Sequence, residues 1–273
     1  MSSELVRGLS KFSTASLLEF IAIILLLAGS GVMISIASYY YKFLEIAQKL
    51  SLHLISPSQI PSWFYTVATY MTIGSALIIL FLIISAVSAY AFLWPAFSAF
   101  SRHDKKFYIP NLLVKIGIVG YTVMFISSIA LSTYFTTVLI RSIHKMSPIG
   151  ILLYIKSLTM KILPIALTLG ILLTIFHILT LCGICIGLYY LRSYGLSGLF
   201  TISMILLIID IVLIIVTTPG IHTTLSMFRM ATAVSSITSL IQPIPGLIAC
   251  ILIFIACRIL KSRIEKEETV TQV

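Results

Sequence analysis

Long runs of apolar residues alternate with short polar clusters along the whole chain. A helix needs about 20 apolar residues to cross a hydrocarbon core of roughly 30 Å. Six runs reach or approach this length, so the pattern predicts an all-α integral membrane protein with six transmembrane helices. The second span is expected to stop near Pro95, because proline removes a backbone donor. The predicted spans are residues 20–41, 64–94, 112–140, 163–191, 199–216 and 237–260.

The sixth run differs from the others because Gln242, Pro243, Pro245 and Gly246 interrupt it. Such residues free backbone groups, which are tolerated at membrane depth only inside protein or beside water. We therefore predict six helices with an interrupted sixth. Two alternatives stay open: five spans with a re-entrant segment, or prolines that only open the helix at the membrane surface.

Composition supports the membrane assignment and narrows the class of protein. Hydrophobic residues make up 59% of the 273 residues and charged residues 10%, whereas a soluble domain carries about a quarter of its residues as charge. This excludes a soluble enzyme, a disordered tail and a disulfide scaffold. The first apolar run is longer than a signal-peptide core, so we interpret it as a retained helix. Residues 1–273 are expected to form a single polytopic membrane domain.

Charge predicts the orientation. The 18 Lys and Arg residues outnumber the 8 Asp and Glu residues, which gives a formal net charge of +10. Eleven of the basic residues fall in the termini and in the second and fourth connections, on one side of the predicted membrane. The positive-inside rule then places both termini in the cytoplasm of a plasma-membrane protein. Direct nucleic-acid contact is not needed to explain these charges. The residues expected to contact anionic lipid headgroups or a cytoplasmic partner are Arg102, Lys105, Lys106, Arg258, Lys261 and Arg263.

Long and short connections alternate, which predicts three helical hairpins at about residues 1–100, 101–192 and 193–260, followed by a charged tail at 261–273. The pattern Ser-(Leu/Ile)-His-x-x-Ser-Pro begins at residue 51 and recurs 91 residues later. We interpret the first two hairpins as a duplication, with parallel repeats of the kind found in some transporters. Alternatively, the motif is a polar loop ahead of a turn. The repeated loop residues are His53, Ser56, Pro57, His144, Ser147 and Pro148.

Few titratable side chains lie within the predicted spans. Asp210 is near the middle of the fifth span, where an acid costs several kcal/mol unless it is protonated, paired or facing water. His177 is in the middle of the fourth span. Counted from the connection near residue 195, the two lie about 22 Å and about 27 Å along their helices. They could meet directly or through one water, as a proton relay or as a structural polar clamp. Glu19 and Lys115 are expected to pair with each other or to snorkel toward the headgroups.

Small residues in the fourth span predict helix packing. Gly183 and Gly187 form a G-x-x-x-G pattern, which lets another helix approach closely. Cys182 and Cys185 form a C-x-x-C in the same stretch, but a second ligand pair for a tetrahedral metal is missing nearby. We interpret these cysteines as packing residues and expect no metal site.

Catalytic motifs and cofactor sites are not evident in the sequence. It contains no P-loop, no G-x-S-x-G and no H-E-x-x-H pattern. Haem b would need two histidines at matching depth, and only the loop pair His53 and His144 approaches that arrangement. We therefore expect a protein without a cofactor that is not an enzyme.

Three hypotheses for function follow. The first is a non-enzymatic membrane subunit that forms a pore, conduit or scaffold within a larger transport or translocation assembly, with other membrane subunits or further copies of itself as partners. The second is an ion-coupled secondary transporter that uses the His177–Asp210 pair. The third is an electron-transfer subunit that holds haem or contacts quinone.

Overall fold

The computed structural model describes residues 2–36, 39, 46, 61–143, 148–224 and 241–271. Within these ranges every regular element is helical and no strand occurs. Two short 3-10 turns, η4 (Lys105–Phe107) and η5 (Arg192–Tyr194), join long helices at one end of the molecule. The long helices are α1 (Ser2–Ser35), α3 (Ser62–Val87), α5 (Tyr108–Ile143), α6 (Pro148–Leu191), α7 (Ser197–Thr224) and α9 (Ile244–Thr271).

Six of the described helical stretches are long and apolar enough to cross a membrane. This confirms the prediction of an all-helical chain with six such helices, and it fits a multi-pass membrane protein. The stretches are Ser3–Ser35, Ser62–His103, Lys105–Phe135, Met160–Tyr194, Ser197–Thr217 and Ile244–Glu267.

The helices are longer than the apolar runs that predicted them. α1 begins at Ser2 rather than at residue 20, because Arg7 and Lys11 are too polar for the hydrocarbon yet are good helix formers. α6 begins at Pro148 rather than at residue 163 and reaches 44 residues. A proline in the first turn does not oppose the helix, because its missing N–H would have no partner there.

The second helix does not stop near Pro95, and that prediction was wrong. α3 continues through a π-helical turn, η3 (Ser88–Leu93), into α4 (Trp94–His103). Pro95 lies in the first turn of α4, directly after the widened turn, so the chain accommodates the proline without ending the helix. The Ser88 hydroxyl at the start of η3 donates a hydrogen bond of 3.0 Å to the Ala15 carbonyl of α1.

The predicted interruption of the sixth segment falls at the start of α9. Gln242 and Pro243 form a turn, and the Leu247 N–H donates a hydrogen bond of 2.9 Å to the Pro243 carbonyl. Pro245 and Gly246 then lie in the first turn of α9, which is continuous to Thr271. Residues 225–240 lie outside the described ranges.

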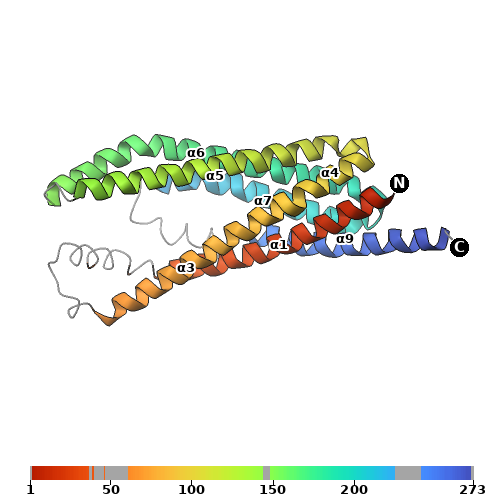
Figure 1. Ribbon diagram of the computed structural model, residues 1–273, viewed down its shortest axis with the longest axis horizontal. Coiled ribbons are helices and arrows are strands. Elements are labelled where there is room, and N and C mark those ends of the chain that lie inside the picture. The colour runs from red at the N-terminus through yellow and green to blue at the C-terminus, as the bar shows by residue number, and fades with distance from the viewer. Residues whose placement is uncertain are drawn as a thin grey trace.

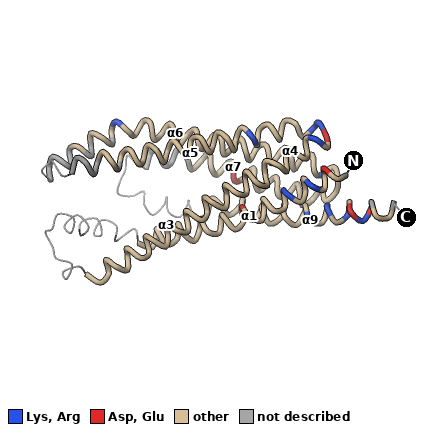
Figure 2. Tube along the Cα trace, in the orientation of Figure 1, with Lys and Arg blue, Asp and Glu red and all other residues tan. Residues whose placement is uncertain are grey.

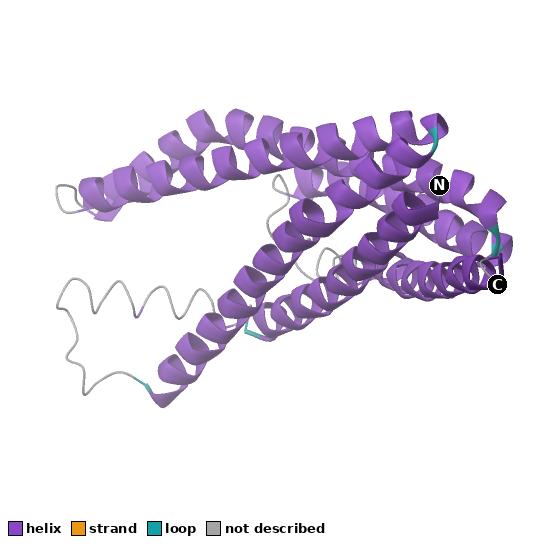
Figure 3. Cartoon of the chain, turned by 45° about the vertical axis from the view of Figure 1, so that its right-hand side comes forward, coloured by secondary structure: helices purple, strands orange, loops and turns teal. Residues whose placement is uncertain are grey.

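The helices form two groups that lie side by side (Figure 1), with α5, α6 and α7 in one group and α1, α3 and α9 in the other. Close contacts pair α5 with α6, α1 with α3, and α7 with α9, and further contacts join α1 to α9 and α6 to α7. Both termini lie at the same end. Toward the other end the α5–α6 pair and the α1–α3 pair diverge, which is visible in two orientations (Figures 1 and 3).

Charged residues gather at the end of the molecule that carries the termini (Figure 2). The helices are largely free of charge along the rest of their described length. We name this end, with Arg7, Lys11, Arg102 and Lys261, the charged end. The separation of charge from the apolar helix bodies is what a membrane-spanning bundle requires.

The tightest packing also lies at the charged end. Phe12, Phe97, Phe100 and Phe107 are at most 2% exposed. The ring centroids of Phe12 and Phe97 are 5.5 Å apart and those of Phe97 and Phe100 are 5.8 Å apart, both with edge-to-face geometry. Such aromatic pairs add to the stabilisation from buried area. This aromatic cluster fixes how α1, α4 and α5 enter the bundle.

Candidate functional site

Asp210 lies on α7 and faces the interior of the helix bundle. Asp210 is 8% exposed, whereas the preceding Ile208 and Ile209 are 45% and 43% exposed. The nearest element is the first turn of α9: a Cβ built on Gly246 would lie 3.0 Å from the Asp210 Oδ2 atom. A larger residue at this position would crowd the carboxyl, so the glycine lets the α9 start and the acid lie close together.

α9 begins at the depth of Asp210. Near the charged end, a Cβ built on Gly195, just ahead of α7, would lie 3.5 Å from Leu260 Cδ1 of α9. Asp210 is 15 residues after Gly195 and Gly246 is 14 residues before Leu260, so both lie about 20 Å along their helices from that contact. The apolar stretch of α7 runs on to Thr217. The N-terminus of α9 therefore lies within the apolar span of its neighbour.

The Asp210 carboxyl lies in an apolar setting beside the N-terminus of α9. A helix N-terminus carries about half a positive charge, but Pro245 supplies no N–H here and the Leu247 N–H donates to the Pro243 carbonyl. Within the described ranges, Asp210 has no hydrogen bond and no ion pair. An acid in this position can bind and release a proton or a small cation without first breaking an ion pair.

Glu19 is a second acid within the apolar body of the bundle. It lies on α1, partly buried, and its Oε1 atom accepts a hydrogen bond of 3.2 Å from the Ser85 hydroxyl of α3. The expected pair with Lys115 is not formed. The Lys115 ammonium instead lies 5.5 Å from the centre of the Trp94 ring, as a cation–π contact.

Cys250 is buried on α9, one helical turn beyond Gly246, which lies beside Asp210. We name Glu19, Ser85, Asp210 and Cys250 the interior polar group. Its members lie on α1, α3, α7 and α9. Sequence reasoning named Asp210 and Glu19 but missed Ser85 as the partner of Glu19. The available signal was an acid and a serine inside otherwise apolar runs.

His177 lies outside this group. It is on the exposed face of α6, with its ring centroid 6.1 Å from that of Tyr121 on α5. The helices that carry His177 and Asp210 touch, but no hydrogen bond and no ion pair within 4.0 Å joins these two residues, both of which are described. Their pairing, directly or through a water, stays a prediction.

The two glycines of the predicted packing motif lie at close helix contacts. A Cβ on Gly183 would lie 2.9 Å from Val114 Cγ2 and 3.0 Å from the Pro110 carbonyl oxygen. A Cβ on Gly187 would lie 2.6 Å from the Phe97 ring. These contacts bring α6 against both α5 and α4.

The repeated loop residues fall mostly outside the described ranges. Of them only Pro148 is described, as the first residue of α6. His53, Ser56, Pro57, His144 and Ser147 lie in segments of which nothing structural is said.

The basic residues expected to meet lipid or a partner lie at the charged end. Lys105 and Arg263 are exposed. The Arg258 guanidinium is 5.5 Å from the Phe254 ring centre, the Lys261 ammonium is 3.8 Å from Glu265 Oε1, and Arg102 lines a small recess beside α1.

Lys106 belongs to a compact polar contact at the same end. Its backbone N–H donates a hydrogen bond of 3.0 Å to Asp104 Oδ1, and its ammonium is 3.1 Å from Asp104 Oδ2. The Tyr194 hydroxyl donates a hydrogen bond of 3.2 Å to the same carboxyl. These interactions, first of all the backbone hydrogen bond, lower the pKa of Asp104 below its ordinary value of 3.8.

Comparisons with protein-family models, with curated proteins and with solved structures found no match to this chain.

Proposed function

We propose that this chain is a non-enzymatic multi-pass subunit of a larger membrane assembly for transport or translocation, in which it forms part of a pore, conduit or scaffold. Other membrane subunits, or further copies of the chain, would be its partners. The proposal places the protein in the plasma membrane with the charged end toward the cytoplasm.

One observation supports a subunit role most directly: the helices expose hydroxyl side chains away from the charged end. Thr69 and Thr72 on α3, Thr133 on α5 and Thr168 on α6 are exposed, and Ser127 on α5 is half-buried. Each hydroxyl donates to a carbonyl one turn earlier in its own helix. Small and hydroxylated residues are typical of helix–helix interfaces in membranes, so these faces suit partner helices better than lipid.

The same helices pack little within the chain. Residues 119–135 of α5 and 160–180 of α6 include no fully buried residue, and α3 buries only Val67 and Gly74. Helices that expose most of their surface in one chain gain packing contacts when a partner is added. The pairing of α1 with α3 and of α5 with α6 is also compatible with the proposed duplication, and so with a repeat-built scaffold.

The experiment that tests this proposal measures assembly size. The full chain, extracted in several mild detergents, should migrate well above its 30.2 kDa mass, and mass spectrometry should identify its partners. A photo-crosslinking residue at Thr72 on exposed α3 should give a cross-linked product. The same residue at Gly74, which faces Met33 of α1, serves as the matched internal control. A monomer in every detergent, with no product from Thr72, would contradict the proposal.

Proton-coupled transport is the second candidate, and the position of Asp210 favours it. Transporters built from discontinuous helices place interrupted helix ends beside their substrate and ion sites near the bilayer midplane, and Asp210 lies beside the start of α9. Glu19 would supply a second carboxyl for the same path.

Proteoliposomes test this candidate without knowledge of the cargo. A pH-sensitive dye inside the vesicles should report proton uptake driven by an imposed membrane potential. Asp210→Asn should reduce the uptake to the background of empty vesicles, and Glu265→Gln, at an exposed acid of the charged end, should leave it unchanged. Equal uptake by wild type and Asp210→Asn would exclude the coupling role.

A further inference from the structure

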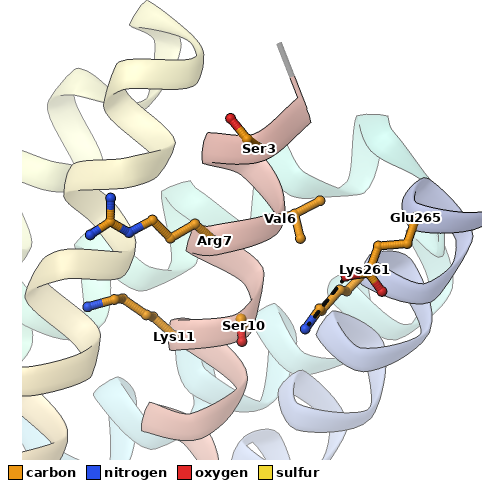
Figure 4. Close-up of a pocket in the computed structure, with 7 residues that line it drawn as sticks. All are labelled: Ser3, Val6, Arg7, Ser10, Lys11, Lys261 and Glu265. Carbon is orange, nitrogen blue, oxygen red and sulfur yellow. Dashed lines mark ion pairs between the residues drawn. The ribbon is translucent and has the colours of Figure 1, made fainter. Parts of the chain in front are cut away.

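Two recesses open on either side of α1 at the charged end. The larger has a volume of about 500 Å³ and lies between α1 and α9 (Figure 4). The smaller has a volume of about 220 Å³ and lies between α1 and α4. Arg7 lines both. The larger recess is lined by Ser3, Val6, Arg7, Ser10, Lys11, Lys261 and Glu265.

Positive charge dominates the larger recess. Arg7, Lys11 and Lys261 contribute three cations against the single acid Glu265. Figure 4 shows Arg7 and Lys11 extending to one side of the α1 face and Lys261 on α9 across from its other side. Ser3 and Ser10 place hydroxyl donors along the face between these cations. The arrangement suits an anion with several acceptor oxygens, such as a phosphodiester.

The α1 face that lines the recess continues into the membrane as an apolar stripe. Leu17, Ile21 and Ile24 are 39%, 39% and 44% exposed. They follow Ser3 and Ser10 at spacings that keep them on the same side of a helix. A polar recess at the end of an apolar stripe matches a lipid, which has a charged headgroup and apolar chains, better than a free anion.

We propose that the larger recess is a binding site for an anionic phospholipid. The phosphodiester lies over Ser3 and Ser10 with Arg7 and Lys11 on one flank and Lys261 on the other, and an acyl chain follows Leu17, Ile21 and Ile24. The inference requires only that the charged end lies at a membrane surface. It does not depend on the chain being a subunit of an assembly.

Native mass spectrometry of the purified full chain tests this site. Phosphatidylglycerol is titrated against phosphatidylcholine with the same acyl chains. The triple variant R7Q/K11Q/K261Q should bind phosphatidylglycerol about a hundredfold more weakly, because each basic residue near a membrane surface contributes about fivefold in affinity. Binding of phosphatidylcholine should change little.

A matched triple variant separates a site from general attraction. K105Q/R263Q/K266Q removes the same charge from exposed positions at the same end but outside both recesses. It should weaken phosphatidylglycerol binding by much less than the recess variant. Equal losses in the two variants would overturn the proposal, because they would show diffuse electrostatic attraction.

Two measurements on the wild-type chain keep the test valid if the recess variant does not fold. Preference for phosphatidylglycerol should fall steeply between about 0.1 and about 1 M salt, where the Debye length shrinks from about 10 to about 3 Å. Inorganic phosphate at millimolar concentration should not displace the lipid. Displacement by phosphate would assign the recess to a soluble anion, and a salt-independent preference would remove the proposed role of the cations.

Discussion

The two ends of the helix bundle are both rich in large apolar side chains, but they use them differently. At the charged end Phe97, Phe100 and Phe107 are fully buried against neighbouring helices. Away from it, Ile126 on α5 is 60% exposed and Ile165 on α6 is 52% exposed. The difference shows that hydrophobicity decides whether a segment suits an apolar environment. Shape complementarity decides which neighbouring helix the segment packs against. The charged end is built to hold one chain together, and the other end has surface left for partners or lipid.

Truncation of a buried aromatic side chain at the charged end should cause the largest loss of stability. Phe100→Ala removes a ring that is 0% exposed and packs edge-to-face on Phe12 and Phe97. We expect the free energy of unfolding in mixed micelles to fall by about 3–5 kcal/mol, because a cavity remains. Ile126→Ala is the control from the other end and should change it by less than about 0.5 kcal/mol. Similar losses for both variants would show that the two ends are packed alike.

Glycine substitutions should show an effect of opposite sign at the two ends. Gly183→Ala places a Cβ 2.9 Å from Val114 Cγ2 and 3.0 Å from a backbone oxygen, so we expect a destabilisation of about 1–3 kcal/mol. Gly170, on the same helix, has no neighbouring atom within 4 Å of the added Cβ. Gly170→Ala should stabilise the helix by up to about 1 kcal/mol, because alanine is the better helix former. Thermal unfolding of the two variants in one detergent measures both effects.

The smallest expected effect concerns pH. The pKa of Asp104 is lowered in the folded chain, so its contribution to stability is fully present above its ordinary pKa of 3.8 and is lost as the pH falls through the lower folded value. Because Asp104 is near the surface, the contribution is small. Asp104→Asn should make unfolding slightly easier at neutral pH and should flatten the loss of stability below about pH 4. An unchanged pH profile for this variant would assign the acid sensitivity to other carboxyls.

Much of the architecture was predictable because it depends on sums over many residues. The number of helices long and apolar enough to cross a membrane follows from the lengths of the apolar runs, and the gathering of charge at one end follows from the positions of the basic residues. The helix limits were less predictable, because a helix continues past the point where hydrophobicity ends. The extension of α1 to Ser2 and the passage through Pro95 by way of a π-helical turn are both of this kind.

The interior polar group could be predicted only in part, because it depends on which helix faces which. The apolar run around Asp210 indicates that burying the acid costs free energy. Nothing in that run predicts that Gly246 lies beside it. That contact depends on where α9 begins and on how far α7 and α9 overlap. Likewise, the Glu19–Ser85 hydrogen bond joins residues 66 positions apart, and no local pattern links them.

α6 is much longer than a helix needs to be to cross the hydrocarbon of a bilayer. At 44 residues it measures about 66 Å, against about 30 Å for the hydrocarbon. Even at a tilt of about 40°, the upper end of the usual range, it rises about 50 Å along the membrane normal. About 20 Å of the α5–α6 hairpin must then stand clear of the hydrocarbon. A chain whose described part holds only helices thus presents paired helix surface beyond the hydrocarbon, on a helix that carries Pro164 in its interior.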